Sequence, residues 1–559
     1  MRSGPEPQSI DWPTVDPIPP ERTRAHPTTE VHGPPGRPWA RWGAVGAGAV
    51  AVGVLLAVAM GRLSQQVPLN SDQASSVLEG YAMGHGNPLL GGWTLPSDSF
   101  FTSKLPLLAL LEKLQGLTPQ VVYEVTGLLG AAVVLVAVWL AGGRLRGLQR
   151  AAAILVTGAL LTSQVLLIPG AGNSSFPSGA MLPAGTDHAA SLLLLLIAWL
   201  ALQRAQRSRA WLWVTWVALA AASVGDPLAA AVGGGAIAGA GVLDLVAGRR
   251  DGVRWDASLI GVGVSSAVAA PIAWWGIRRL GGFTAAPLLG NGYGLPPVVS
   301  SLSHNLSEGG QALLTVFGAD FLNQSGGAAL ASSLLHLCGL GLVVGVLGCV
   351  LWPRRWLGLS VVSRVLALGM LLDAGAYIVG QQATDLTSAR YLIPFLGFGA
   401  VLTGREGIPR LLALRPRLGL GPATLGAAYL AVFAIGAATA QPAPAPLAGV
   451  TAYLTDNGQT YGLGTYWDAN VVTVSTRGAI AVRAVDTQPA SVSPFLWHST
   501  ISWYDPGRDR ATFVLLAATD FRDRESVEAL LGEPTEIETL DGVTIMVWTA
   551  NLLGELASP

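Results

Sequence analysis

Eleven runs of apolar residues constrain the fold of this chain more than any other feature, because each approaches the ~20 residues that a helix needs to cross a bilayer. A chain with 51% hydrophobic and 12% charged residues has too little polar surface for a soluble fold. We therefore predict a polytopic α-helical membrane protein with about 11 transmembrane helices. The predicted spans are Trp42–Met60, Val121–Leu140, Ala151–Pro169, His188–Leu202, Ala210–Val224, Leu228–Ala247, Ser258–Trp275, Ala329–Leu351, Ser360–Gly380, Tyr391–Thr403 and Gly421–Ala440.

Arginine residues cluster in alternate loops between these runs. Basic residues in short loops stay on the cytoplasmic side, so we expect a plasma-membrane protein with a cytoplasmic N-terminus and an extracytoplasmic C-terminal part. The clustered residues are Arg144, Arg146, Arg150, Arg204, Arg207, Arg209, Arg249, Arg250, Arg254, Arg354, Arg355, Arg405, Arg410, Arg415 and Arg417. The few basic residues of the opposite loops, which oppose this rule and invite a functional explanation, are Arg62, Lys104, Lys113, Arg278, Arg279 and Arg390.

Composition divides the chain into three parts. Residues 1–40 contain ten prolines and no helical period, which predicts a disordered, proline-rich cytoplasmic tail. Residues 41–441 form the expected transmembrane domain, with a large first external loop at 61–120 and a second external loop at 278–328 that has the composition of a mobile cover. Residues 449–559 alternate as strands do, the first being A-N-V-V-T-V at 469–474, and predict an extracytoplasmic α+β domain with one helix at Arg524–Leu531.

The first external loop concentrates ionisable residues in a chain that has few of them. The stretch Asn70–Pro119 holds Asp72, Glu79, Asp98 and Lys104. Asp72 and Glu79 are spaced to lie two turns apart on one helix. A lysine at the membrane interface can bind phosphate as a point charge. We therefore expect the functional site in this loop.

Three further external positions carry candidate residues. Arg390 begins the string R-Y-L-I-P at the mouth of the tenth span, where an arginine is costly unless it meets an anion. His188 lies at the mouth of the fourth span, and Asp226 lies in V-G-D-P-L between the fifth and sixth spans. These short loops are expected on the same side of the membrane as the first external loop.

Together these strings resemble the GT-C superfamily of polyprenyl-phosphate-sugar-dependent membrane glycosyltransferases, which includes the protein O-mannosyltransferases and the lipid A aminoarabinose transferases. In such enzymes the acid matching Asp72 is the general base, the lysine matching Lys104 stands in Lys-Pro-Pro-Leu, and the arginine matching Arg390 contacts the donor's phosphate. The sequence departs from this pattern at Gln73, which replaces the second acid of an Asp-Glu pair, and at Leu105, which replaces the first proline.

The resemblance implies an inverting transferase that moves a sugar from a polyprenyl-phosphate donor to an extracytoplasmic acceptor, which is a glycan, lipid or protein of the cell envelope. Asp72 would accept the acceptor's proton while Lys104 and Arg390 hold the departing phosphate. The further residues expected to bind substrate are Glu79, Asp98, Asp226 and His188. The sequence requires no cofactor and leaves a divalent metal open.

Each candidate residue also has a purely structural interpretation. These alternatives are helix capping by Asp72, His188 and Asp226, snorkelling of Lys104 to lipid headgroups, and pairing of Arg390 with Asp385. They need no substrate, because caps and interfacial cations are common in membrane proteins that lack catalysis.

Two other classes of function are open. A transporter or flippase of a lipid-linked glycan would have ionisable residues near the middle of the membrane, where this chain has little besides Asp244 and Asp373. A non-catalytic scaffold of envelope assembly could share the same fold, since fold does not fix function. The chain lacks P-loop, dinucleotide and zinc motifs, and its net charge of −1 gives no basis for binding nucleic acid.

Overall fold

The structure is a computed structural model that describes residues 38–162, 186–248, 253–286, 298–322, 327–380, 383, 386–414, 420–488, 491–517 and 521–557. Most of the tail expected at 1–40, and Asp385, lie outside the described residues. The chain separates into two compact units, Met1–Ala51 and Val52–Pro559. The second unit contains every candidate site residue that the structure describes.

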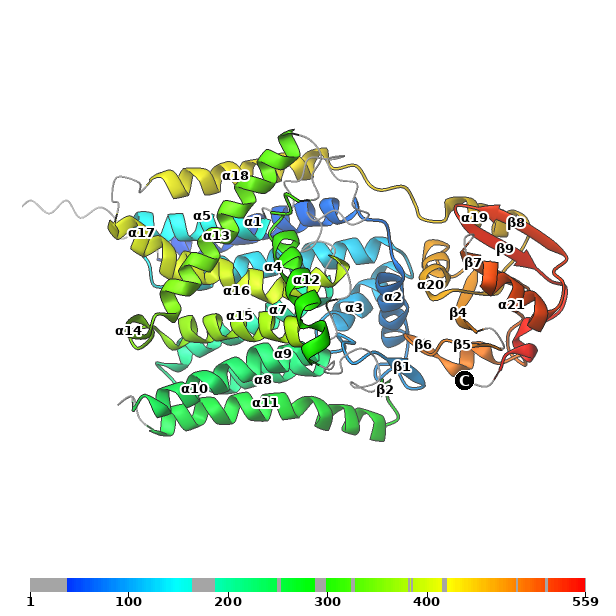
Figure 1. Ribbon diagram of the computed structural model, residues 1–559, viewed down its shortest axis with the longest axis horizontal. Coiled ribbons are helices and arrows are strands. Elements are labelled where there is room, and N and C mark those ends of the chain that lie inside the picture. Colours follow the sequence, from blue (N-terminus) through cyan, green and yellow to red (C-terminus); the bar gives the residue numbers. More distant parts are fainter. Residues whose placement is uncertain are drawn as a thin grey trace, which may run out of the picture. The chain divides into compact units, whose positions relative to one another are not determined.

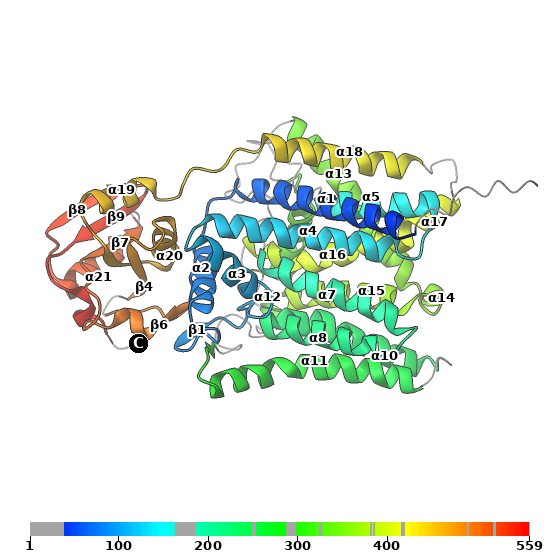
Figure 2. The same cartoon turned by 180° about the vertical axis from the view of Figure 1, so that it is seen from behind.

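Long apolar helices dominate the chain up to residue 439 (Figures 1 and 2). Eight helical segments of the described residues are long and apolar enough to cross a membrane. They fall in α1 (Pro38–Ser64), α4 (Gln120–Gly142), α7 (Thr186–Ala205), the run from α9 (Pro227–Ala229) to α10 (Ala236–Val246), α11 (Val253–Arg279), α13 (Gly327–Leu351), α15 (Val361–Val379) and α18 (Leu420–Thr439). The chain is a multi-pass membrane protein, as predicted; the count of eleven spans stays a prediction.

The other predicted spans are also helical in their described parts. α5 (Gly147–Thr162) and α8 (Trp211–Gly225) are apolar but shorter than the eight long segments. α16 (Ile393–Leu402) continues through a π-helical turn into α17 (Ile408–Leu414). Every apolar run that the sequence analysis identified therefore forms at least one helix.

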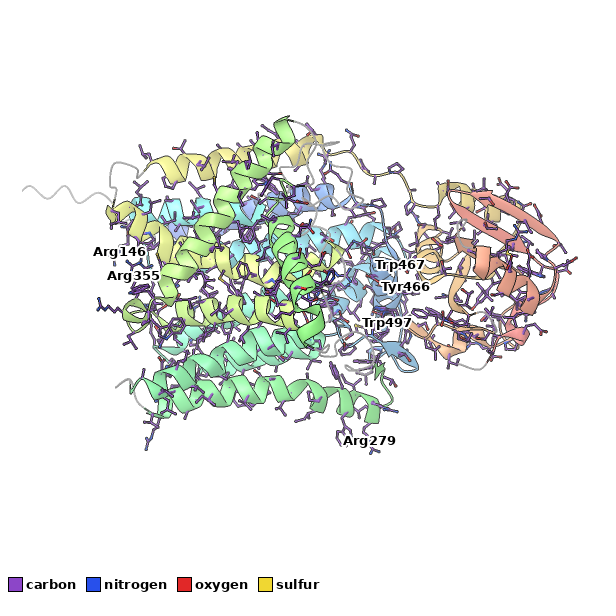
Figure 3. All side chains as sticks on the ribbon, viewed as in Figure 1. Arg146, Arg279, Arg355, Tyr466, Trp467 and Trp497 are labelled. Atoms are coloured by element: carbon purple, nitrogen blue, oxygen red, sulfur yellow. The ribbon has the colours of Figure 1, made fainter. Side chains whose placement is uncertain are left out.

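Arg146 and Arg355 lie at the opposite end of the helices from Arg279 and from the aromatic residues of the C-terminal domain (Figure 3). Figure 3 places Arg146 and Arg355 at one end, and Tyr466, Trp467 and Trp497 at the other. Arg146 and Arg355 belong to loops that the charge rule places on one side of the membrane, whereas Arg279 is one of the basic residues that oppose the rule. The side of the membrane on which each end lies stays a prediction.

The first external loop is built from short ordered elements. α2 (Ser71–Gly84), the strand β1 (Trp93–Leu95) and α3 (Leu105–Gln115) follow α1 along the chain. Apolar side chains of α2, α3 and the start of α4 share one buried cluster, which orders a loop that carries many ionisable groups.

The second external loop contains a long helix where the structure describes it, and its role as a mobile cover stays a prediction. α12 spans Val298–Val316 and packs against α15. Asn305 of α12 donates hydrogen bonds to the carbonyl oxygens of Ile378 at 2.8 Å and Gly380 at 3.1 Å. These bonds satisfy carbonyls at the end of α15 that the helix itself leaves open, so the Asn305 side chain ties α12 to α15.

The C-terminal domain contains a six-stranded sheet in the order β5-β4-β3-β7-β9-β8. Its strands are β3 (Tyr461–Gly464), β4 (Ala481–Gln488), β5 (Ser491–Pro494), β7 (Phe513–Ala517), β8 (Glu536–Leu540) and β9 (Val543–Val547). Alternate residues of β7 enter two different cores, with Phe513 and Leu515 in one and Val514 and Leu516 in the other. Side chains of β7 therefore alternate between the two faces of the sheet, and both faces are buried. The helices of this domain are α19 (Ala448–Asp456), α20 (Tyr466–Ser475) and α21 (Phe521–Leu531).

One strand prediction is wrong. The segment A-N-V-V-T-V at 469–474 lies in the helix α20, and all six of its residues are buried. A short, continuously buried run has no periodicity that separates helix from strand. The decisive factor is tertiary: β3 and β4 pair in parallel, so the chain between them has to cross over, and a helix makes such a connection.

A second, three-stranded sheet joins the first external loop to the C-terminal domain. β1 pairs in parallel with β2 (Thr284–Ala285) and antiparallel with β6 (Ser499–Thr500). In this register Thr94 lies opposite Ser499, and Trp93 lies opposite Thr500. Backbone hydrogen bonds thus fix segments that are about 400 residues apart in sequence.

Candidate active site

The start of α2 is determined by a capping box. The Asn70 side chain accepts a hydrogen bond from the Gln73 amide at 2.9 Å, and the Gln73 side chain accepts one from the Asn70 amide at 3.3 Å. Gln73, the position where the sequence departs from an Asp-Glu pair, therefore has a structural role in this reciprocal cap. The N-cap is Asn70 and not Asp72. Asp72 instead lies in the first turn, where the helix dipole favours a negative charge.

Two distant segments meet at the Asp72 carboxylate. Arg390, in the 3-10 helix Leu386–Leu392, lies 3.5 Å from Oδ2, and the hydroxyl of Tyr466 donates a hydrogen bond to Oδ1 at 2.8 Å. The side chains of Asp72 and Arg390 are 25% and 35% exposed, so a ligand can reach both. The base and one of the two cations expected from the sequence are therefore in contact.

Lys104 lies one layer deeper than Arg390. It is 3% exposed, and its Nζ donates a hydrogen bond to the Ser76 hydroxyl at 2.6 Å. Ser76 in turn donates to the carbonyl oxygen of Asp72 at 2.9 Å. A lysine buried in this way does not snorkel to the headgroups. It adds a positive charge beneath the turn of α2 that carries Asp72.

The helix α2 therefore has two functional stripes with a spacing of four residues. The first consists of Asp72, Ser76 and Gly80, which face Arg390, Lys104 and the side chain of Glu112. The second consists of Ser71, Ser75 and Glu79, which all bond to the C-terminal domain. One short helix thus connects the expected chemistry to the domain beyond it.

The segment before Lys104 is anchored to the end of α8. The Phe100 amide donates to the carbonyl of Gly225 at 2.8 Å, and the Thr102 hydroxyl donates to the carbonyl of Ala221 at 2.5 Å. Phe100 adopts a left-handed backbone with φ of 52°, a strained conformation for a bulky residue that tertiary contacts have to maintain. Its ring lies 5.3 Å from the Lys104 Nζ.

His188 and Asp226 form a buried pair next to this segment. Their Nδ1 and Oδ2 atoms lie 3.0 Å apart, and both side chains are almost fully buried. Asp226 also accepts a hydrogen bond from the Leu228 amide at 3.0 Å, so it does cap the helix that follows. The His188 ring contacts Phe100 and Tyr391, at 5.5 and 4.7 Å between ring centroids. The pair thus supports the residues that adjoin Lys104 and Arg390.

Glu79 lies in the junction with the C-terminal domain. Its side chain is fully buried, and its Oε1 lies 2.5 Å from Nδ1 of His498. Burial lowers the pKa of His498, but the carboxylates of Glu79, Asp72 and Asp98 outweigh burial and make the net shift upward. The charged form of His498, which would pair with Glu79, is thus more favourable here than for a histidine in water. Asp98 is half-buried, and a role in binding substrate stays a prediction for both acids.

Glu112 is a buried carboxyl that the sequence analysis did not consider. It is 0% exposed, and its two oxygens have no hydrogen-bond partner among the residues that the structure describes. It lies against Gly80, where a Cβ would be only 2.7 Å from Oε2. Burial raises the pKa of Glu112 to about 9. The side chain is therefore neutral at physiological pH. Because it carries no negative charge, it does not compete with Asp72 for Lys104 or Arg390.

This neutral acid predicts a specific pH dependence of stability. Because the folded-state pKa of Glu112 lies above the ordinary 4.5, the carboxyl destabilises the fold increasingly as pH rises from 4.5 towards 9. Glu112→Met should remove this penalty, which is up to about 4 kcal/mol near pH 7.5 at ~1.4 kcal/mol per pKa unit. We expect the thermal unfolding midpoint of the purified variant to exceed that of the wild type, by a margin that widens between pH 6 and 9.

The exposed Glu525 of α21 provides a matched control, because Glu525→Met removes a solvated carboxylate. This control should show no widening margin. A constant difference between Glu112→Met and the wild type across the pH range would contradict a buried, protonated Glu112.

Two aromatic residues of the C-terminal domain, Trp503 and Tyr504, have partners within the structure. Trp503 packs on Arg483, with 3.9 Å between the guanidinium and the ring, and on Trp93. Tyr504 is buried and donates its hydroxyl to the carbonyl of Ala484. These two residues therefore belong to the packing of the domain.

Tyr466 and His498 are the site residues that sequence reasoning missed. No sequence pattern connects them with α2. Trp467, beside Tyr466, is 64% exposed. Within the described ranges, no three His, Cys, Asp or Glu side chains are grouped closely enough to hold a metal ion.

A separate apolar cavity of about 380 Å³ lies among α5, α13, α17 and α18. Its lining is almost entirely hydrocarbon, with His336 and Tyr429 as its polar side chains of note. The Nδ1 of His336 bonds to the carbonyl of Gly318 at 2.9 Å. Such a lining suits a hydrocarbon chain and not a sugar.

Comparisons with known proteins place this geometry in a fold. No protein-family model matches the sequence, and no curated protein matches it. The structure resembles ArnT from Cupriavidus metallidurans bound to undecaprenyl phosphate, with a TM-score of 0.51 and 12% identity over 93% of this chain and 99% of that chain. The apo form of the same protein gives a TM-score of 0.42 and 13% identity over 93% of this chain and 100% of that chain.

The likeness to the lipid-bound ArnT structure shows that this chain has the same fold. The architecture expected from the sequence, a helical membrane domain followed by a C-terminal domain that contains strands, is thereby confirmed. At 12% identity the likeness concerns the fold alone, and the roles of the site residues depend on their own geometry.

Proposed function

We propose that this protein is a membrane glycosyltransferase of the plasma membrane that transfers a sugar from a polyprenyl-phosphate donor to an extracytoplasmic acceptor. The observation that carries the proposal is the contact between Asp72 and Arg390, which are 318 residues apart in sequence. A carboxylate beside an accessible guanidinium, with Lys104 beneath, provides a proton acceptor and two cations at one place. Undecaprenyl phosphate, which ArnT from Cupriavidus metallidurans binds, is a donor carrier of the proposed class.

Each residue then has a defined part in the transfer. The acceptor's hydroxyl loses its proton to Asp72 while its oxygen attacks the anomeric carbon from the face opposite the phosphate, so the configuration inverts. The bond from the anomeric carbon to the phosphate oxygen breaks, and its electron pair leaves with the polyprenyl phosphate. Arg390 contacts the leaving phosphate directly because it is accessible. Lys104, which is buried, stabilises the same negative charge through the local field.

The apolar cavity among α5, α13, α17 and α18 supports a lipid-linked donor. Its hydrocarbon lining matches isoprene units, and each buried CH₂ contributes about 0.8 kcal/mol to binding. The proposal therefore separates two functions. Polar residues near α2 recognise the phosphate and perform the transfer, and the helices α5, α13, α17 and α18 hold the polyprenyl chain of the donor.

The transporter alternative has less support. Asp244 forms a buried ion pair with Arg364, and Asp373 accepts a hydrogen bond from the Phe395 amide at 2.8 Å at the start of α16. The acids that would mark a pathway in the middle of the membrane thus have structural partners. The accessible charged residues of the candidate site gather instead at one end of the helices, beside the C-terminal domain.

Loss of the gene tests the proposal directly. A deletion strain should lack one envelope glycan by mass spectrometry and accumulate the corresponding polyprenyl-phosphate sugar, because transfer consumes that donor. Detergent-solubilised membranes of this strain then contain unused donor and unmodified acceptor, and purified wild-type protein should restore the glycan in them. An unchanged glycan profile in the deletion strain would refute the transferase. Glycan loss that the purified protein cannot restore in solubilised membranes, where no bilayer separates the reactants, would favour a flippase or scaffold.

A further inference from the structure

The C-terminal domain contacts the Asp72 carboxylate through the side chain of Tyr466. Tyr466 is the first residue of α20, and its hydroxyl lies 2.8 Å from Oδ1 of Asp72. Arg390 meets the other carboxylate oxygen. The orientation of the proposed base is thus set by two residues, one from the membrane domain and one from the C-terminal domain.

We infer that Tyr466 is a positioning residue for the transfer and that the C-terminal domain thereby completes the active site. The inference rests on the proposed function of Asp72 as the base. A carboxylate that is held by a hydrogen bond at one oxygen cannot rotate freely, so its remaining lone pairs keep a fixed direction towards the acceptor's hydroxyl.

The chemistry of Tyr466 suits this role. Burial, together with the nearby charge of Asp72, raises the pKa of the Tyr466 phenol well above its usual range. The phenol therefore stays protonated and remains a hydrogen-bond donor throughout the working pH range. It does not compete with Asp72 for the proton of the acceptor.

The position of Tyr466 is fixed by contacts on both sides of the junction. The Ser71 hydroxyl donates to the carbonyl oxygen of Tyr466, and Asn470, one turn further along α20, donates to the Ser75 hydroxyl at 2.8 Å. The Tyr466 ring stacks with that of His498, at 6.4 Å between centroids. Bonds from two successive turns of α20 to two successive turns of α2 hold the phenol to a narrow range of positions.

These contacts hold the C-terminal domain on α2, in addition to the pairing of β6 with β1. Ser71, Ser75 and Glu79 bond to the C-terminal domain from one stripe of the helix, and Asp72 lies beside this stripe. A domain that served only to select the acceptor would not need to contact the base. The Tyr466 bond instead makes the rate of transfer depend on a docked C-terminal domain.

The test replaces the hydroxyl and separates rate from binding. Purified full-length Tyr466→Phe is added to serial dilutions of solubilised deletion-strain membranes, and glycan formation is followed by mass spectrometry. We expect the maximal rate to fall by about 10- to 100-fold, because a single positioning contact is lost. The amount of membrane that gives half the maximal rate should change by less than about two-fold, since the donor's contacts remain.

Tyr504→Phe is the matched control, because its hydroxyl is also buried in the C-terminal domain but bonds to the carbonyl of Ala484 at 2.5 Å. With rates normalised to folded protein, this variant should transfer like the wild type. An unchanged maximal rate in Tyr466→Phe, an equal loss in Tyr504→Phe, or a gain from removing a hydroxyl that obstructs the acceptor would each overturn the inference. Failure of the wild-type protein in the same assay would instead overturn the transferase itself, and this inference with it.

Discussion

Replacement of Asp72 by asparagine is expected to lower the maximal rate of glycan formation by about 10²- to 10⁴-fold, the range that a general base supplies. Asparagine has nearly the same shape, and its carbonyl oxygen can still accept the hydrogen bond from Tyr466. The variant should therefore fold, bind the donor and fail at proton removal. The measurement is glycan formation from solubilised deletion-strain membranes, with protein levels checked by blot.

The exposed Asp456 of α19 provides the control for this substitution, because Asp456→Asn removes a carboxylate of the C-terminal domain without touching α2. It should keep the wild-type rate. If Asp72→Asn also kept that rate with normal protein levels, Asp72 would not be the base, and the transfer mechanism proposed here would be wrong.

Loss of the accessible cation should have the second largest effect. Arg390→Gln removes the guanidinium that is 35% exposed beside Asp72, and a preorganised charge of this kind is worth about 10²- to 10³-fold in rate. The variant should also bind undecaprenyl phosphate more weakly, as measured by the thermal stabilisation that the lipid gives to the purified protein. Undecaprenol, which lacks the phosphate, should stabilise the wild type and the variant equally.

Two further substitutions distinguish a specific contact from general loss of charge. Arg279→Gln removes an exposed arginine outside the candidate site, at the end of α11 (Figure 3), and should leave both measurements unchanged. Lys104→Met should lower the rate but weaken lipid binding less than Arg390→Gln does, since Lys104 is buried against Ser76. Equal stabilisation of Arg390→Gln and the wild type by undecaprenyl phosphate would mean that Arg390 does not contact the phosphate.

The sequence by itself determined the membrane architecture and identified the loop in which the candidate site lies. Each apolar run forms a helix because, in hydrocarbon, the backbone has to satisfy its hydrogen bonds within the segment, and this requirement depends on composition alone. The loop Asn70–Pro119 stood out because charged residues are scarce in the rest of the chain. Local signals also sufficed for Asn70 and Gln73, whose spacing is that of a capping box.

Only the tertiary structure decided which residues meet. The interactions of Asp72 with Arg390 and with Tyr466 bridge 318 and 394 residues, and no local pattern encodes a contact at such a separation. The helix α20 was mistaken for a strand for the same reason, since the parallel pairing of β3 and β4 imposes a crossover that the buried run does not reveal. Glu112 is neutral because α2 packs over it at Gly80. Burial, which sets its protonation state, is a property of the assembled fold.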